Sequence, residues 1–165
     1  MSRKVLIIMG SDSDLKTMEE TAKALKLVEV PCELRIASAH RTPQKAIQLA
    51  QEARDRGFGV IVAGAGMAAH LGGVLAAHTT LPVIGVPLAS GILAGMDALM
   101  ATVQMPQGIP VACMGVGASG AYNAGLLAAA ILAVEDLELA RRLEKLREEM
   151  AEKVEQKDAA LQRKA

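Results

Sequence analysis

The stretch VLIIMG, Val5 to Gly10, is a continuous apolar run that ends at a glycine. Such runs are typical of strands covered on both faces, as in parallel sheets. Two further runs repeat the pattern, VIVAGAG from Val60 to Gly66 and PVIGVPL from Pro82 to Leu88. Because helical stretches lie between these runs, the chain is predicted to be an α/β protein with a parallel sheet.

Two more segments bring the predicted parallel sheet to five strands. ELRIAS, Glu33 to Ser38, alternates polar and apolar residues, which places it at a sheet edge, and PVACMGVG, Pro110 to Gly117, is the last strand. The helices are predicted from apolar residues at helical spacing and from small-residue stretches. These are Leu15, Met18, Ala22 and Leu25; Ala46, Ile47, Ala50 and Ala53; Met96 to Gln104; and Ala118 to Ala133.

A charged C-terminal helix is predicted over about residues 136–160. Its narrow apolar stripe requires a partner surface, on the same domain or on a neighbouring subunit. The stripe and the small residues of the preceding helix together predict a homo-oligomer. The length of 165 residues corresponds to a single domain, residues 1–165. The stripe is formed by Leu139, Leu143, Leu146, Met150 and Val154.

Composition excludes several classes of function. The formal net charge is zero, which argues against partners such as nucleic acid or an anionic membrane surface. Phe58 and Tyr122 are the only aromatic residues, so stacking on nucleic-acid bases is not expected. The start of the chain has too short an apolar run for a signal peptide, and a cytoplasmic location is expected. Cys32 and Cys113, in predicted strands, are expected to be reduced core thiols.

The first candidate site segment, MGSDSD, follows the first predicted strand. Gly10 allows a tight turn, and Ser11 and Ser13 place hydroxyls near the amides of a helix N-terminus, where a phosphate is favoured. Asp14 is better suited to accept hydrogen bonds from sugar hydroxyls. The alternative is that a serine or aspartate here only caps the helix.

The second segment, SAHRTP, lies between the second predicted strand and a helix. Thr42 and Pro43 are a favourable N-cap and first-turn pair. Ser38, His40 and Arg41 precede them, at the carboxyl end of the strand, where ligands bind in open parallel sheets. An arginine can bind phosphate, and a histidine can transfer protons near neutral pH. His40 is therefore the candidate general acid and base.

The third segment, AGAGMAAHLGG, follows the third predicted strand. Its glycines, Gly66 among them, allow the backbone to approach a small planar group closely. His70 lies within it, either as a site residue or with only a hydrogen bond to the backbone. His78 is expected on the surface of the same helix. The three histidines lack a metal-ligand spacing, so no metal site is expected.

Three protein classes fit a chain of this architecture. A flavodoxin-like electron carrier usually stacks aromatic residues on its flavin, and this chain has almost none. A response-regulator receiver requires an aspartate at the end of the third strand, where Ala63, Gly64 and Ala65 stand. A lyase or isomerase that acts on a phosphorylated ribosyl compound uses all three segments.

With these motifs in order, the sequence resembles the PurE family of purine biosynthesis, over roughly Val5 to Val134. The resemblance implies a flavodoxin-like three-layer α/β/α fold, an octamer with sites between subunits, and no cofactor. It implies a mutase that converts 5-(carboxyamino)imidazole ribonucleotide to 4-carboxy-5-aminoimidazole ribonucleotide. The motifs are MGSDSD, SAHRTP, AGAGMAAHL, PVIGVP, VQMPQGIPVA from Val103 to Ala112 and NAGLLAAAIL from Asn123 to Leu132.

The same resemblance assigns roles to residues. His40 is the general acid and base, and small residues around the third segment retain carbon dioxide. The implied substrate-binding residues are Ser11, Asp14 and Arg41, with Ser13 and Ser38 near the phosphate, and Gly66, Ala68, Ala69, His70 and Leu71 around the carbon dioxide pocket.

Two departures from the family pattern concern the third segment. The family commonly has a glycine where this chain has Met67 and a proline where it has Gly72, and the loss of the proline predicts a more mobile loop. A second branch carboxylates aminoimidazole ribonucleotide directly and typically has lysine after the histidine. Arg41 favours the mutase branch. A phosphoribosyl-binding protein without enzymatic activity is a further alternative.

Overall fold

The computed structural model describes residues 3–163, so the expected single domain over 1–165 extends beyond the described residues at both ends. In order, the elements are β1 (Lys4–Met9), the 3₁₀ turn η1 (Asp12–Asp14), α1 (Leu15–Leu27), β2 (Cys32–Ile36), α2 (Pro43–Glu52), β3 (Phe58–Gly66), α3 (Leu71–Ala76), β4 (Val83–Leu88), α4 (Met96–Val103), β5 (Ala112–Cys113), α5 (Ala118–Ala133) and α6 (Leu137–Gln162).

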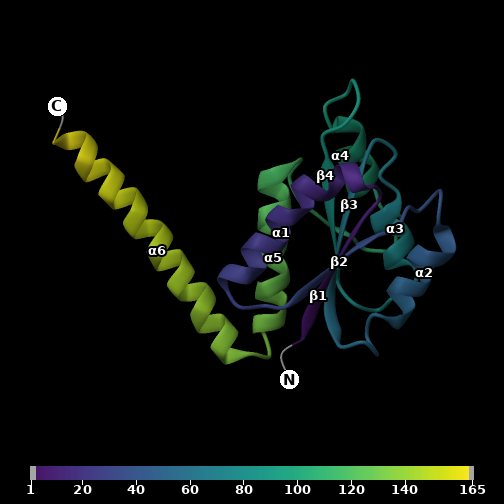
Figure 1. Ribbon diagram of the computed structural model, residues 1–165, viewed down its shortest axis with the longest axis horizontal. Helices are drawn as coiled ribbons and strands as arrows, with labels where there is room; N and C mark the ends of the chain where they lie inside the picture. The colour runs from purple at the N-terminus through teal and green to yellow at the C-terminus, as the bar shows by residue number, and fades with distance from the viewer. Residues whose placement is uncertain (1–2, 164–165) are drawn as a thin grey trace.

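The five strands form one parallel sheet in the order β2-β1-β3-β4-β5. This is the predicted five-stranded sheet, with β2 at an edge. Figure 1 shows α1 and α5 on one side of the sheet and α2 and α3 on the other. The predicted three-layer α/β/α fold is therefore confirmed.

The sheet has an apolar layer on each face because alternate residues of a strand point to opposite sides. Val5, Ile7 and Met9 of β1 pack in one buried cluster with residues of α1 and α5. Leu6 and Ile8 pack in a second cluster with residues of α2 and α3. The continuous apolar run of β1 follows from burial on both faces.

The Ala-rich helix α5 packs closely on α1. The Thr21 hydroxyl donates a 2.7 Å hydrogen bond to the Ala121 carbonyl across this contact. A Cβ atom added to Gly125 would lie 2.6 Å from the Thr21 carbonyl oxygen, so a larger side chain would separate the helices. The small residues of α5 thus serve packing within the chain.

The last predicted strand is much shorter than expected. Only Ala112 and Cys113 pair with β4, although the sequence predicted a strand from Pro110 to Gly117. Pro87 of β4 has no N–H group and cannot continue the ladder as a donor. Beyond β5, the chain still follows β4 through two isolated hydrogen bonds. The Met114 amide donates to the Gly85 carbonyl, and the Gly117 amide donates to the Pro87 carbonyl.

Several predicted helix positions differ in their burial. Met18 and Leu25 of α1 are buried, but Leu15 is exposed. On α2, which ends at Glu52, Leu49 is buried and Ile47 only half-buried. The apolar spacing fitted both helices, but the sheet contacts a slightly different stripe of each. Ala46, Ala50 and Ala53 are buried as predicted, and Ala22 is half-buried.

Residues 3–163 cover only the first turns of α6. Leu139 is buried, and Leu143 and Leu146 pack partly against the core. Met150 and Val154, at 50% and 64% exposure, continue the predicted stripe into solvent. In Figure 1, α6 extends away from the rest of the molecule. The stripe is thus partnered by its own domain over about half of its length.

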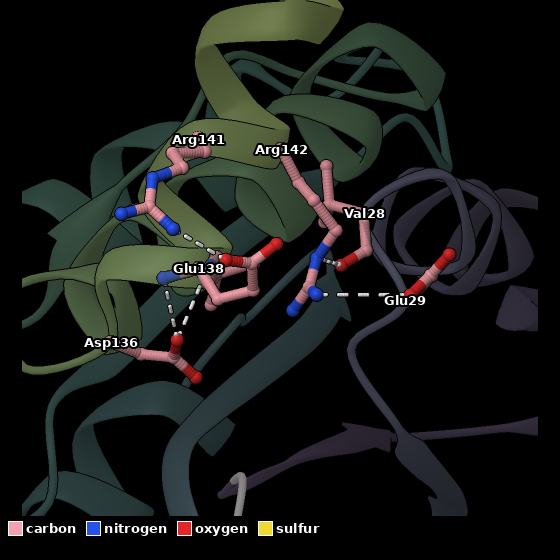
Figure 2. Close-up of polar contacts among 7 residues, drawn as sticks. Val28, Glu29, Asp136, Glu138, Arg141 and Arg142 are labelled. Atoms are coloured by element: carbon pink, nitrogen blue, oxygen red, sulfur yellow. Dashed lines mark hydrogen bonds and ion pairs between the residues drawn. The ribbon is translucent and has the colours of Figure 1, made fainter.

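A polar network fixes the start of α6 (Figure 2). The Asp136 carboxylate caps the helix by accepting hydrogen bonds from the amides of Glu138 and Leu139, at 3.1 and 3.0 Å. Arg142 Nε donates to the Val28 carbonyl at 2.9 Å, and Arg142 Nη1 lies 3.7 Å from Glu29. These contacts attach α6 to the segment between α1 and β2.

Candidate active site

A cavity of about 440 Å³ lies at the carboxyl ends of the strands. Its wall comes from the loops after β1, β2 and β3, with one residue after β4. The order of the strands reverses between β1 and β3, which is where open α/β sheets bind ligands. The lining residues are Gly10, Ser11, Ser13, Asp14, Ser38, Ala39, His40, Arg41, Ala65, Gly66, Met67, Ala68, Leu71 and Ser90.

A second cavity of about 430 Å³ shares one wall with the first. Ser11, Ser38 and Arg41 line both cavities, and Lys45 lines only the second. Lys45 lies on the first turn of α2, and because it lines this second cavity together with Arg41, two positive charges adjoin the same space. This is a site feature that the sequence analysis missed. The available signal was a second basic residue just inside a predicted helix start.

The loop after β1 folds into a capped 3₁₀ turn instead of leading directly into α1. Ser11 Oγ accepts a hydrogen bond from Ser13 N at 3.4 Å, and the Asp14 carboxylate accepts one from Ser11 N at 3.0 Å. Ser13 N also donates to the Asp12 carboxylate at 3.1 Å. The capping bonds that the sequence suggested are therefore present, and the amides of Ser11 and Ser13 donate to side chains of the same turn.

The two carboxylates of this turn have opposite pKa shifts. Burial raises the pKa of Asp14 above its usual value, because the ionised form loses hydration, although the bond from Ser11 N opposes this. The exposed Asp12 accepts a hydrogen bond from the Ser11 hydroxyl, which lowers its pKa. Asp14 therefore lies in the drier environment of the two.

The loop after β2 is held by its own side chains. Ser38 Oγ accepts hydrogen bonds from the amides of His40 and Arg41, at 3.3 and 3.1 Å. Thr42 occupies the N-cap position of α2, but its hydroxyl bonds to the backbone of Ser38 and does not cap the helix. The predicted cap position is correct, while the hydroxyl closes the loop that presents His40.

Arg41 joins the first two loops. Its Nη2 donates a 3.0 Å hydrogen bond to the Gly10 carbonyl at the end of β1. The guanidinium has further N–H groups, and the side chain is exposed on the wall of both cavities. Arg41 is thus held in position while it retains donors for an anion.

His40 and His70 contact each other directly. His40 Nε2 lies 2.9 Å from His70 Nδ1, and the rings meet edge to face with centroids 5.0 Å apart. One of the two nitrogens must carry a proton and the other must accept it. One interpretation of the sequence was that the His70 side chain only forms a hydrogen bond to the backbone. In the structure it is the His78 side chain that forms such a bond, with Nδ1 2.8 Å from the Val74 carbonyl oxygen.

The structure brings most of the predicted residues together. Ala69 is the exception, because it is buried and does not line the cavity, and His70 reaches the site through His40. His78 is half-buried beyond the end of α3 and not on the surface of that helix. Ser90, after β4, lines the cavity although the sequence analysis gave it no role. Its position after a strand end was the available signal.

A larger cavity, about 760 Å³, lies elsewhere, at the opposite end of the sheet. Arg3, Gly59 and Pro82, near the starts of strands, line it together with the first turn of α6. Three acidic and three basic side chains balance its charge, and Arg142 is already bonded there. Size alone does not identify the site, and the histidine pair favours the smaller cavity.

Two further properties concern the described part of the chain. Among residues 3–163, no group of three or more His, Cys, Asp or Glu side chains is arranged to hold a metal ion. No helix in this range has the length and apolar character needed to span a bilayer. Cys32 and Cys113 are free and half-buried, so the expected core thiols are less buried than predicted.

The strand order and the cavity at its reversal point define a doubly wound α/β protein of flavodoxin-like order. The family model described as AIR carboxylase matches residues 4–153, and the chain belongs to this family.

Individual relatives agree with that assignment. The chain is 55% identical over 148 residues to N5-carboxyaminoimidazole ribonucleotide mutase of Bacillus subtilis, covering 90% of this chain and 91% of that protein. It is also 55% identical to the mutase of Pyrococcus abyssi, over 89% of this chain and 83% of that one. The crystal structure of Treponema denticola PurE matches with a TM-score of 0.86 and 32% identity, over 96% and 98% of the two chains.

Proposed function

We propose that this protein is a mutase of purine biosynthesis that converts 5-(carboxyamino)imidazole ribonucleotide to 4-carboxy-5-aminoimidazole ribonucleotide. The observation that carries the proposal is the exposed His40 on the wall of a cavity at the strand ends, in a chain 55% identical to a mutase. The reaction moves a carboxylate within one molecule, so the enzyme is an isomerase.

The substrate lies across the two adjoining cavities. Ser11, Asp14 and Arg41 bind it, with Ser13 and Ser38 near the phosphate. Support comes from Arg41, whose guanidinium faces both cavities beside Lys45. Asp14 meets the ribose, whose hydroxyls donate to its carboxylate. The segment of Gly66, Ala68, Ala69, His70 and Leu71 surrounds the imidazole and the transferred carbon dioxide.

His40 moves the proton in both halves of the reaction. It first gives a proton to the carbamate nitrogen, and the N–C bond breaks with its electron pair left on nitrogen, which releases carbon dioxide. An electron pair of the ring then forms a C–C bond to carbon dioxide. His40 takes the proton from that ring carbon, which restores aromaticity. His40 regains in the second half the proton that it gives up in the first, so it ends in its starting protonation state.

His70 positions His40. Before substrate binds, the hydrogen bond between the rings orients the His40 imidazole, with its Nε2 toward His70 Nδ1. When substrate enters, His40 Nε2 exchanges its partner for the substrate nitrogen or ring carbon.

The finer properties are part of the same proposal. The enzyme is a cytoplasmic homo-octamer of single-domain subunits, without metal or organic cofactor. The exposed stripe at Met150 and Val154 supports subunit contacts, since half of α6 has no partner within the described chain. Light scattering at micromolar concentration tests the assembly, and a stable monomer would contradict it.

The test of function is a comparison of two substrates. We expect turnover of 5-(carboxyamino)imidazole ribonucleotide in buffer depleted of carbon dioxide, followed by absorbance of the product. Turnover only with aminoimidazole ribonucleotide plus bicarbonate would assign direct carboxylation instead. If the protein binds these ribonucleotides but converts neither of them, it would be a phosphoribosyl-binding protein without enzymatic activity.

A further inference from the structure

The backbone at Met67 adopts a conformation that residues with a side chain rarely adopt. Its φ angle is 53°, in the left-handed region. Only two other non-glycine residues of the described range, Glu29 and Ala94, have a positive φ. Glycine occupies such positions without strain, so a strained residue beside a cavity points to a task for its side chain.

The residue before Met67 packs closely against the segment after β4. A Cβ atom added to Gly66 would lie 2.2 Å from the Ser90 hydroxyl oxygen and 3.4 Å from the Leu88 carbonyl oxygen. The end of β3 is therefore pressed against the segment after β4. At the next residue the backbone enters the left-handed region, and the turn continues to His70, whose amide donates to the Ala68 carbonyl at 2.8 Å.

The Met67 side chain stands between the cavity and the segment after β4. It lines the same cavity as His40 and is 59% exposed. A Cβ atom added to Gly91 would lie 3.9 Å from Met67 Cγ, so the side chain passes close to that glycine. Ser90, next to Gly91, lines the cavity too. The thioether thus forms part of the rim.

We propose that Met67 retains carbon dioxide, by folding its side chain over the open side of the cavity next to His40. The inference rests on the proposed function. Carbon dioxide is small and uncharged, and it escapes unless apolar atoms close the space around the ring. Methionine suits this task because it is unbranched and flexible, so it can admit the ribonucleotide and then cover it. Closure also excludes water from the reacting groups.

The experiment follows the fate of the transferred carbon. The substrate carries ¹³C in its carbamate carboxylate, and the buffer contains unlabelled bicarbonate. The fraction of product that keeps the label reports retention, after subtraction of the decay without enzyme. Met67→Gly is expected to raise the loss of label by about threefold or more, because the rim loses its apolar cover.

Met67→Leu is the matched control, since it keeps an apolar side chain of similar volume and the same backbone strain. It is expected to retain the label like the wild type. Equal retention by Met67→Gly and the wild type would overturn the proposal. Loss of label accompanied by dissociation of the assembly in light scattering would also overturn it, because Met67 would then be a subunit contact. Failure of the wild type to convert the substrate would contradict the proposed function itself.

Discussion

The two ends of the sheet carry cavities of very different character. The cavity at the amino ends is larger, about 760 Å³, but its arginine and acidic side chains balance each other, and Arg142 anchors α6. The cavity at the carboxyl ends has about 440 Å³ and is lined by His40, which contacts His70, by the partly buried Asp14 and by the strained Met67. The difference shows that a shifted pKa, as at Asp14, and backbone strain, as at Met67, identify a site better than the volume of a cavity does.

The largest effect is expected for His40→Asn. Loss of the proton carrier should lower kcat by about 100-fold or more, with substrate affinity changed only a few-fold. Steady-state kinetics and calorimetric binding on one preparation check both parts. His78→Asn is the control, because His78 contacts the Val74 carbonyl away from the cavity. Normal turnover of His40→Asn would show that the reaction does not take place in the cavity at the carboxyl ends of the strands.

A pair of arginine variants compares the two ends directly. Arg41→Ala should raise KM by about 10- to 100-fold, the range expected for losing charge-assisted hydrogen bonds to a phosphate. Arg142→Ala should leave KM unchanged and lower the free energy of unfolding by about 1–2 kcal/mol, through loss of the bond to Val28. Urea unfolding measures the second effect. A raised KM in Arg142→Ala would contradict the separation of roles.

Met67→Gly tests the strain at the carboxyl end. Relief of the left-handed conformation should raise the free energy of unfolding by about 1 kcal/mol. Met67→Ala keeps a Cβ atom, so it should show no such gain. Thermal and urea unfolding of the wild type, Met67→Gly and Met67→Ala measure these free energies. Equal stability of all three would mean that the turn stores no strain.

The smallest effect concerns Asp14 and pH. Burial raises the pKa of its carboxyl in the folded state above the unfolded value of 3.8. The stability associated with its protonated form is therefore complete below pH 3.8 and is lost as pH rises through the folded pKa. Asp14→Asn cannot ionise, so its free energy of unfolding, relative to the wild type, should increase over that range. Urea unfolding at several pH values measures the difference, and a decrease would contradict the burial argument.

The sequence predicted the sheet well because strands buried on both faces leave long apolar runs. The fifth strand was predicted too long, since a pattern of side chains does not show that Pro87 interrupts the ladder. Ile47 of the predicted apolar stripe is only half-buried, and Leu15, at helical spacing in the first helix, is exposed, because the exact stripe that a helix buries depends on its rotation against the sheet.

The site was predicted in part for a similar physical reason. His40 and Arg41 lie next to a strand end, so their position follows from the chain direction. The contact between His40 and His70 joins loops 30 residues apart and could not be read from local spacing. The left-handed backbone of Met67 and the close approach of Gly66 to Ser90 are features of the tertiary structure, which local residue patterns do not reveal.

A crystal structure with bound 4-carboxy-5-aminoimidazole ribonucleotide tests the difference between the two ends most directly. The account predicts that the ligand occupies the cavities at the carboxyl ends, with its ring within hydrogen-bond distance of His40 and its phosphate beside Arg41. Binding in the larger cavity, among Arg3, Arg54 and Arg142, would contradict it.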